Sequence, residues 1–244
     1  MESSGTSASG PDFIPSRLAT ELVSDSFATV RHNFWGFVRI GFILAVLSFA
    51  ASLIPVVGEL VMGAVVAAAG VVAAVMAFSH GTVPAIRSVA SGFKLVLPVL
   101  GAQLLYTLAI VLLAITIIGI PYAIHLSVRW SFVVPAIVLE RLSIRPSFSR
   151  STELVRGQWW RIVGCALLMG LALIGFFIVV FGVWFVVVAF IPPIGILLLL
   201  VLIPLSLAFL NVGYVFTTLL YVDSRTRKEA YSRDQLHTEI AAYA

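Results

Sequence analysis

Arginine is concentrated in one stretch of the sequence, residues 140–161 (ERLSIRPSFSRSTELVRGQWWR), which lies between two long apolar segments. It holds five arginines against two glutamates: Arg141, Arg145, Arg150, Arg156 and Arg161 against Glu140 and Glu153. Guanidinium groups bind phosphates and carboxylates through paired N–H donors. Next to apolar segments, the anionic groups we expect them to meet are lipid headgroups.

From Pro146 the same stretch has the pattern of an amphipathic helix, with Ser147 as a possible N-cap residue. A period of 3.6 residues gathers two sets on opposite sides: Phe148, Thr152, Val155 and Trp159 on one, Arg150, Glu153, Arg156 and Arg161 on the other. Such a helix lies along a membrane surface, with tryptophans at headgroup level. We expect Trp35, Trp159 and Trp160 to be interface anchors of this kind.

A second pair of polar residues falls inside an apolar segment. His125 and Arg129 are one helical turn apart and therefore share a face. A charge at the bilayer centre costs at least ~2.5 kcal/mol, so it usually faces a bundle interior or a wet cavity. The functional interpretation is a site for an anionic group, either a lipid phosphate or a substrate carboxylate. The structural alternative is an Arg129 that reaches the membrane surface or binds backbone carbonyls, beside a satisfied core histidine.

Composition places the chain among integral membrane proteins. Hydrophobic residues make up 61% and charged residues 11%, with a mean hydropathy of +1.11, whereas soluble domains are about a quarter charged. The net charge of +4 flanks apolar segments, so it favours anionic lipids over nucleic acid as partner. The single cysteine, Cys165, can form neither an internal disulfide nor a thiolate metal cluster.

Six apolar segments are long enough to cross a bilayer, which takes about 20 helical residues. They cover residues 34–57, 59–78, 95–120, 122–139, 162–190 and 194–222. The sequence therefore predicts an all-α polytopic membrane bundle of six transmembrane helices, arranged as three hairpins with amphipathic interfacial connector helices. Residues 1–15 are expected to be a disordered tail, 16–223 the transmembrane domain and 224–244 a cytoplasmic tail.

Charge in the loops predicts the orientation. Three connections (IPVVGE, GIPY and FIPPIG) are short Pro/Gly turns without lysine or arginine, and the basic residues of the other connections all fall on the opposite side. Short loops rich in lysine and arginine stay in the cytoplasm. We therefore expect a multi-pass protein of the cell membrane with both termini cytoplasmic.

A weak internal repeat accompanies this layout. Residues 30–35 (VRHNFW), 89–94 (VASGFK) and 155–160 (VRGQWW) each precede an apolar hairpin. Either triplication of one unit or convergence on the same interfacial residues explains the similarity.

Motifs for catalysis and metal binding are missing from the sequence. No nucleophile motif, zinc-binding spacing or phosphate-binding glycine loop occurs, and no Asp or Glu lies in the interior of an apolar segment, since Glu59, Glu140 and Asp223 are all at segment ends. We therefore expect no enzyme, no metal and no cofactor. The missing membrane carboxylate also weighs against proton- or sodium-coupled transport.

Residues 129–140 (RWSFVVPAIVLE), 150–162 (RSTELVRGQWWRI) and 221–229 (YVDSRTRKE) resemble the membrane domain of bacterial glycerophosphoryl diester phosphodiesterases. That family joins a six-span domain to a soluble catalytic barrel in some members, and we expect no barrel here. The resemblance implies a non-catalytic integral membrane protein that interacts with anionic lipid or scaffolds a partner, either another protein or a second copy. A transporter or flippase-like protein for an anionic lipid or small solute is the alternative, with His125 and Arg129 at its site.

Overall fold

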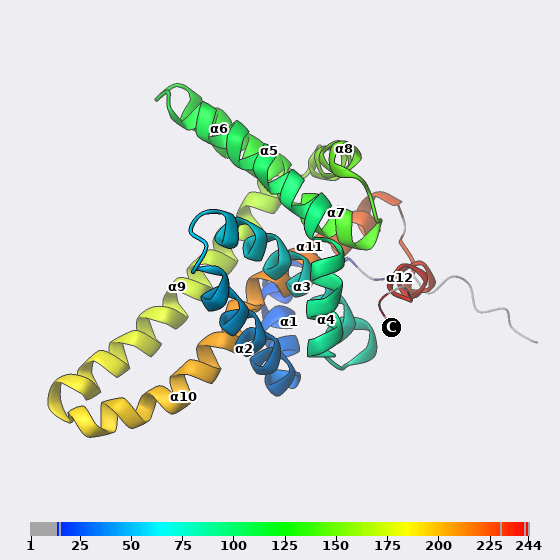
Figure 1. Ribbon diagram of the computed structural model, residues 1–244. Helices are drawn as coiled ribbons and strands as arrows, with labels where there is room; N and C mark the ends of the chain where they lie inside the picture. Colours follow the sequence, from blue (N-terminus) through cyan, green and yellow to red (C-terminus); the bar gives the residue numbers. More distant parts are fainter. Residues whose placement is uncertain (1–13, 15, 230, 242, 244) are drawn as a thin grey trace, which may run out of the picture.

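The computed structural model describes residues 14, 16–229, 231–241 and 243, and this part of the chain is helical, without a β-strand (Figure 1). The helices are α1 (Ala19–His32), α2 (Phe34–Ala51), α3 (Val57–His80), α4 (Ala85–Lys94), α5 (Val96–Ala114), α6 (Gly119–Arg129), α7 (Val133–Leu139), α8 (Ile144–Val155), α9 (Trp159–Phe190), α10 (Pro192–Leu210), α11 (Val212–Glu229) and α12 (Arg233–Ile240). Six stretches are long and apolar enough to span a membrane: Phe34–Ala51, Val57–His80, Val96–Ala114, Gly119–Leu139, Trp159–Phe190 and Pro193–Glu229. The expected all-α bundle of a multi-pass membrane protein is confirmed.

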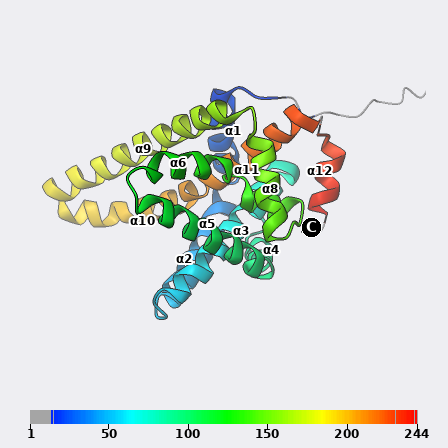
Figure 2. The same ribbon diagram turned by 90° about the horizontal axis from the view of Figure 1, so that it is seen from above.

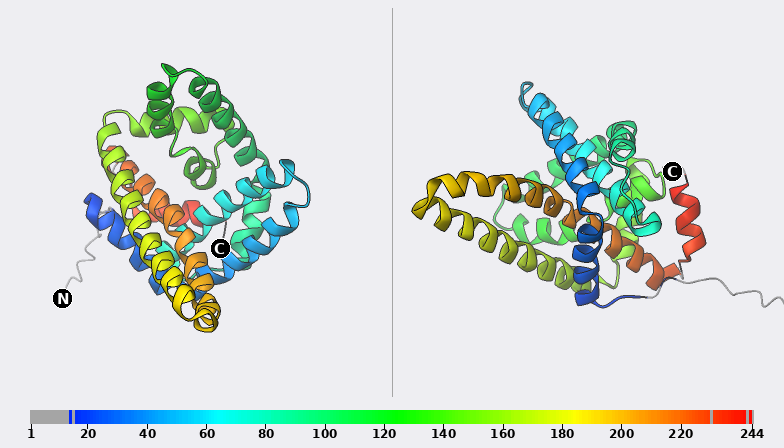
Figure 3. Two further views of the ribbon diagram at one scale, coloured as in Figure 1. Left: turned by 90° about the vertical axis from the view of Figure 1, so that its left-hand side faces the viewer. Right: turned by 90° about the horizontal axis from the view of Figure 1, so that it is seen from below.

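These stretches form three hairpins that diverge from the packed centre. The hairpins are α2–α3, α5 with α6–α7, and α9 with α10–α11. The turns of the second and third hairpins lie on the left in Figures 1 and 2, the α2–α3 hairpin points to the lower left of Figure 2, and α12 lies on the right, away from all three turns. Seen from the turns, the hairpins surround a common centre (Figure 3, left).

The three hairpins are related by a cyclic pattern of contacts. A connector helix precedes each one: α1, α4 and α8. The returning arm of each hairpin packs on the connector of the next, α3 on α4, α7 on α8, and α11 back on α1. The first arms follow the same order, because α3 contacts α5, α6 contacts α9, and α10 contacts α2. The third unit thus closes on the first, and α3, α7 and α11 meet one another at the centre.

The sequence repeat falls at equivalent places in this ring. Residues 30–35 and 155–160 cover the end of a connector helix and the start of a hairpin, α1 to α2 and α8 to α9. Residues 89–94 form the end of the connector helix α4, and α5 begins just after them, at Val96. The equivalence of place is confirmed, whereas its origin by duplication stays a prediction.

Burial differs sharply between the arms. The spanning part of α3 is 78% buried, and that of α9 is 6% buried. Alanine, glycine and valine fill α3, so its neighbours approach closely on all sides; the ring of Tyr214, for example, lies directly over Gly70. The apolar surface of α9 has the exposure that suits contact with lipid chains.

The fourth expected span, 122–139, is not continuous. It divides into α6 and α7, which are joined by a turn at residues 130–132. Pro135 explains the break, because a proline in the first turn of α7 has no N–H to donate and its ring clashes with the carbonyl of Ser131 in a continuous helix. The sixth expected span, 194–222, is likewise interrupted, at Asn211.

The segment expected to be a tail from residue 224 onward is ordered and packed. Helix α11 runs through the expected boundary to Glu229, and α12 buries Leu236 and Ile240. The backbone N–H of Ile14 donates to the carbonyl of Tyr231 (3.4 Å), which joins the start of the described chain to the segment between α11 and α12. The other residues of the expected N-terminal tail, 1–13 and 15, lie outside the described residues.

Candidate functional site

Four of the residues singled out in the sequence line one pocket. His125 and Arg129 of α6 face Arg156 and Trp159 across a pocket of about 300 Å³ at the junction of α6, α8 and α9. Thr152, Val155 and Gly157 complete its lining. The prediction that His125 and Arg129 share a face is confirmed.

The end of α8 shapes this pocket. The helix stops at Val155, and Gly157 takes a left-handed φ of +80°, so that the chain turns before α9 begins at Trp159. A single amphipathic helix running to Trp159 was therefore the wrong expectation. Trp159 faces the pocket from the start of the next helix.

The start of α8 also differs from the prediction. The helix begins at Ile144 with Ser143 before it, two residues earlier than expected. Ser147 is not its cap: that side chain is fully buried, and its hydroxyl donates to the carbonyl of Ile144 (2.7 Å).

Aromatic rings form one wall of the pocket. The Trp159 and His125 rings stack with their centroids 5.5 Å apart, and Trp159 Nε1 donates to the carbonyl of His125 (3.5 Å). Trp160 packs edge-on against Trp159. Trp160 is 80% exposed and Trp35 is 67% exposed. Their role as interface anchors stays a prediction.

The two guanidinium groups of the pocket lack carboxylate partners. Neither Arg129 nor Arg156 forms an ion pair with any residue that the structure describes. Arg129 is half-buried and Arg156 is exposed. Two unpaired cations beside an imidazole and an indole face favour an anion as the occupant.

Ser151 holds Arg129 at this place. Its fully buried hydroxyl donates to the Arg129 carbonyl (2.8 Å) and accepts from the backbone N–H of Phe132 (3.1 Å). The Ser151 side chain thereby supplies hydrogen-bond partners to backbone groups on both sides of the break between α6 and α7. These bonds hold the end of α6, which carries Arg129, against the connector helix α8.

Replacing Ser151 by alanine is expected to lower the free energy of unfolding by about 1–3 kcal/mol, because the Phe132 N–H loses its buried acceptor. The chain supplies its own probe: Cys165 is the single cysteine and is fully buried. Thermal unfolding in detergent can be followed as reaction of Cys165 with a thiol-reactive fluorophore. Ser149→Ala, on the exposed side of the same helix, is the control, and equal melting of both variants would contradict the role of Ser151.

Arg150 lies away from the pocket in a cluster of ion pairs. Its Nε donates to both oxygens of Glu140 (3.0 and 2.9 Å), and its Nη2 donates to Glu229 (2.7 Å). The hydrogen bond that Arg150 donates to Glu229 is the largest of the effects that raise the pKa of Arg150. Tyr221 also donates to Glu140, and Arg225 continues the cluster to Glu239 of α12.

Arg161 belongs to a second cluster, around Asp223. The carboxylate is 2% exposed and accepts from Arg161 (2.6 Å), Arg227 (2.9 Å) and the backbone N–H of Arg17 (2.6 Å). Arg161 and Arg227 both donate to the Arg17 carbonyl as well (3.1 and 2.7 Å). This cluster joins α9 and α11 to the chain before α1, where the third unit meets the first.

Sequence reasoning counted the cations of residues 140–161 but missed these partners. Glu229 lies 79 positions after Arg150, and Asp223 lies 62 positions after Arg161. A signal was present, because the basic run after the last apolar segment also contains Asp223 and Glu229.

Among the described residues, no group of three or more His, Cys, Asp and Glu side chains could hold a metal ion. The chain matches no protein-family model, no curated protein and no solved structure.

Proposed function

We propose that this chain is a non-catalytic membrane protein that binds an anionic lipid headgroup in the pocket between α6, α8 and α9. Arg129 and Arg156 would contact the phosphate, and Trp159 would cover one side of the headgroup. The observation that carries the proposal is a difference between two pairs of arginines. Arg150 and Arg161 are neutralised by carboxylates of the chain. Arg129 and Arg156 line one pocket and have no such partners among the described residues.

The proposal includes an orientation in the membrane and a resemblance to a known family. With the hairpin turns directed outward, the basic connector helices and both termini lie on the cytoplasmic side of the cell membrane, where anionic lipids are concentrated. The resemblance to the membrane domain of glycerophosphoryl diester phosphodiesterases agrees with a protein that handles phosphorylated lipid without catalysis. Association with a protein partner or a second copy stays a prediction.

Arg129→Gln and Arg156→Gln are each expected to weaken binding of phosphatidylglycerol about tenfold or more. The reason is that a hydrogen bond to a charged group contributes about 1.5 kcal/mol or more. Binding can be measured by titrating the lipid into phosphatidylcholine nanodiscs that contain the protein. Arg145→Gln is the matched control, because Arg145 is exposed on α8 and lies outside the pocket. Unchanged affinity in both pocket variants would disprove headgroup binding at this place.

A transporter or flippase-like protein is the alternative, and one observation favours it. The fourth span is interrupted directly after Arg129, and helices broken at a binding site are common in transporters. Reconstituted protein would then move a fluorescent phosphatidylglycerol analogue between leaflets, and Arg129→Leu would abolish the movement. Protein that binds the lipid but moves none of it excludes transport and leaves the binding proposal intact.

A further inference from the structure

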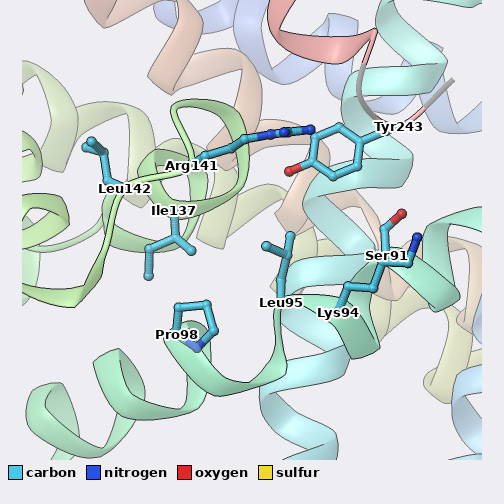
Figure 4. Close-up of a pocket in the computed structure, with 8 residues that line it drawn as sticks. All are labelled: Ser91, Lys94, Leu95, Pro98, Ile137, Arg141, Leu142 and Tyr243. Carbon is cyan, nitrogen blue, oxygen red and sulfur yellow. The ribbon is translucent and has the colours of Figure 1, made fainter.

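A second pocket, of about 360 Å³, lies between the start of α5 and the linker from α7 to α8 (Figure 4). It is separate from the pocket of Arg129, with which it shares no residue. Its volume falls at the lower end of the range for small-molecule sites. Polar and apolar side chains divide its lining.

The polar part carries two cations. Lys94, the last residue of α4, and Arg141, in the linker after α7, both line the pocket. Lys94 forms no ion pair with the described residues, and the Arg141 guanidinium lies 5.6 Å from the centre of the Tyr243 ring. No carboxylate is among the described residues that line the pocket, and the two charged side chains among them are both positive.

Ser91 adds a hydrogen-bond donor without a partner. The residue is 9% exposed and lines the pocket one turn before Lys94, yet its hydroxyl makes no hydrogen bond within the described part of the chain. Figure 4 shows Ser91 on the same side of the pocket as Lys94. Because the hydroxyl lines the pocket without a partner from the described chain, it is available to a ligand.

The positions of Arg141 and Tyr243 are fixed by the backbone. Arg141 has a φ of 53°, a left-handed conformation that costs roughly 1–2 kcal/mol in a residue other than glycine. Tyr243 is tied down by a hydrogen bond from its hydroxyl to the carbonyl of Val138 (2.5 Å). Burial raises the pKa of Tyr243, which favours the protonated hydroxyl that this hydrogen bond needs.

The opposite part of the pocket is apolar. Leu95, Pro98, Ile137 and Leu142 form it, to the left of Ser91 and Lys94 in Figure 4. The spanning helix α5 begins at Val96, just after Ser91 and Lys94 of α4. The lining of the pocket therefore changes from polar to apolar where the chain enters a membrane span. A headgroup next to an acyl chain has the same order of polarity.

We propose that this pocket binds the phosphate of a membrane amphiphile, with Lys94, Arg141 and Ser91 at the phosphate and the start of an acyl chain along Pro98 and Leu142. The phosphate accepts hydrogen bonds from the ammonium, the guanidinium and the hydroxyl. The apolar contacts separate a lipid from a soluble phosphate ester, which would leave that half of the pocket empty.

The proposal can be tested with a phosphatidic acid that carries a photoreactive group in its acyl chain near the headgroup. In phosphatidylcholine nanodiscs, we expect cross-links to the peptides around Pro98 and Leu142. Lys94→Gln and Arg141→Gln should each reduce them about tenfold; glutamine keeps the Cβ of Arg141 and therefore the same backbone cost. Arg145→Gln should change nothing, and slow labelling of Cys165 shows that each variant is folded.

Three outcomes would overturn the proposal: no cross-link at these peptides, equal yields in the Lys94 and Arg141 variants, or full displacement of the lipid by glycerol 3-phosphate. The last would assign the pocket to a soluble phosphate ester. Cross-links at the peptide of Gly157 and Trp159 report on the first pocket independently, so failure of one proposal is distinguishable from failure of the other.

Discussion

Replacing Asp223 by asparagine is expected to lower the free energy of unfolding by about 3–5 kcal/mol, the range for breaking a buried ion pair. The carboxylate is 2% exposed and neutralises Arg161 and Arg227 together. Asparagine keeps the shape but removes the charge, so that two guanidinium groups remain in a partly buried site without an anion. Because the Arg17 backbone also binds this carboxylate, the loss should loosen α1 from α9 and α11 first.

Labelling of Cys165 during heating measures this effect directly, since the residue sits on α9 beside the affected contact. Asp234→Asn is the matched control: Asp234 is exposed on α12 and forms no ion pair among the described residues. The importance of the Asp223 cluster is refuted if both variants expose Cys165 at the same temperature.

Gly70→Ala is expected to destabilise the bundle by about 3 kcal/mol, at the upper end of the cost of overpacking a core. A Cβ at this position would lie 2.6 Å from the Tyr214 ring, and the ring is held between α3 and α11 at the centre of the three units. Relief requires these two helices to separate.

Gly63→Ala on the same helix is the control for this experiment. A Cβ there would come no closer than 3.9 Å to any neighbour, so the substitution should leave stability unchanged or raise it by up to about 1 kcal/mol. Equal thermal stability of the two alanine variants would show that α3 and α11 can move apart at no cost.

Local patterns were sufficient to predict most of the fold. The six apolar segments and the Pro/Gly turns between them depend on neighbouring residues, and the structure has a spanning stretch in each predicted region, although the fourth and sixth are interrupted. The shared face of His125 and Arg129 follows from helical spacing in the same way. The break at residues 130–132 was also within reach, because Pro135 cannot continue a helix from α6.

Contacts between distant segments were beyond such reasoning. The carboxylates that neutralise Arg150 and Arg161 come from α11, and the pocket of Lys94 and Arg141 combines α4, α5, the linker after α7 and Tyr243. These ion pairs and this pocket can be predicted only when the packing of the three units against one another is known. A segment with many cations therefore predicts a need for anions, but it does not reveal whether the protein or a ligand supplies them.

The cyclic contacts have a consequence for connectivity. Each unit begins and ends on the side opposite the hairpin turns. The backbone connects the first unit to the second and the second to the third, whereas side-chain contacts such as Arg161 to Asp223 hold the third unit to the first. Ile14 and Tyr231 lie within hydrogen-bonding distance across that junction. Because the contacts are cyclic, we expect a circular permutation that begins the chain at the second or third unit to keep the same pairs of helices in contact.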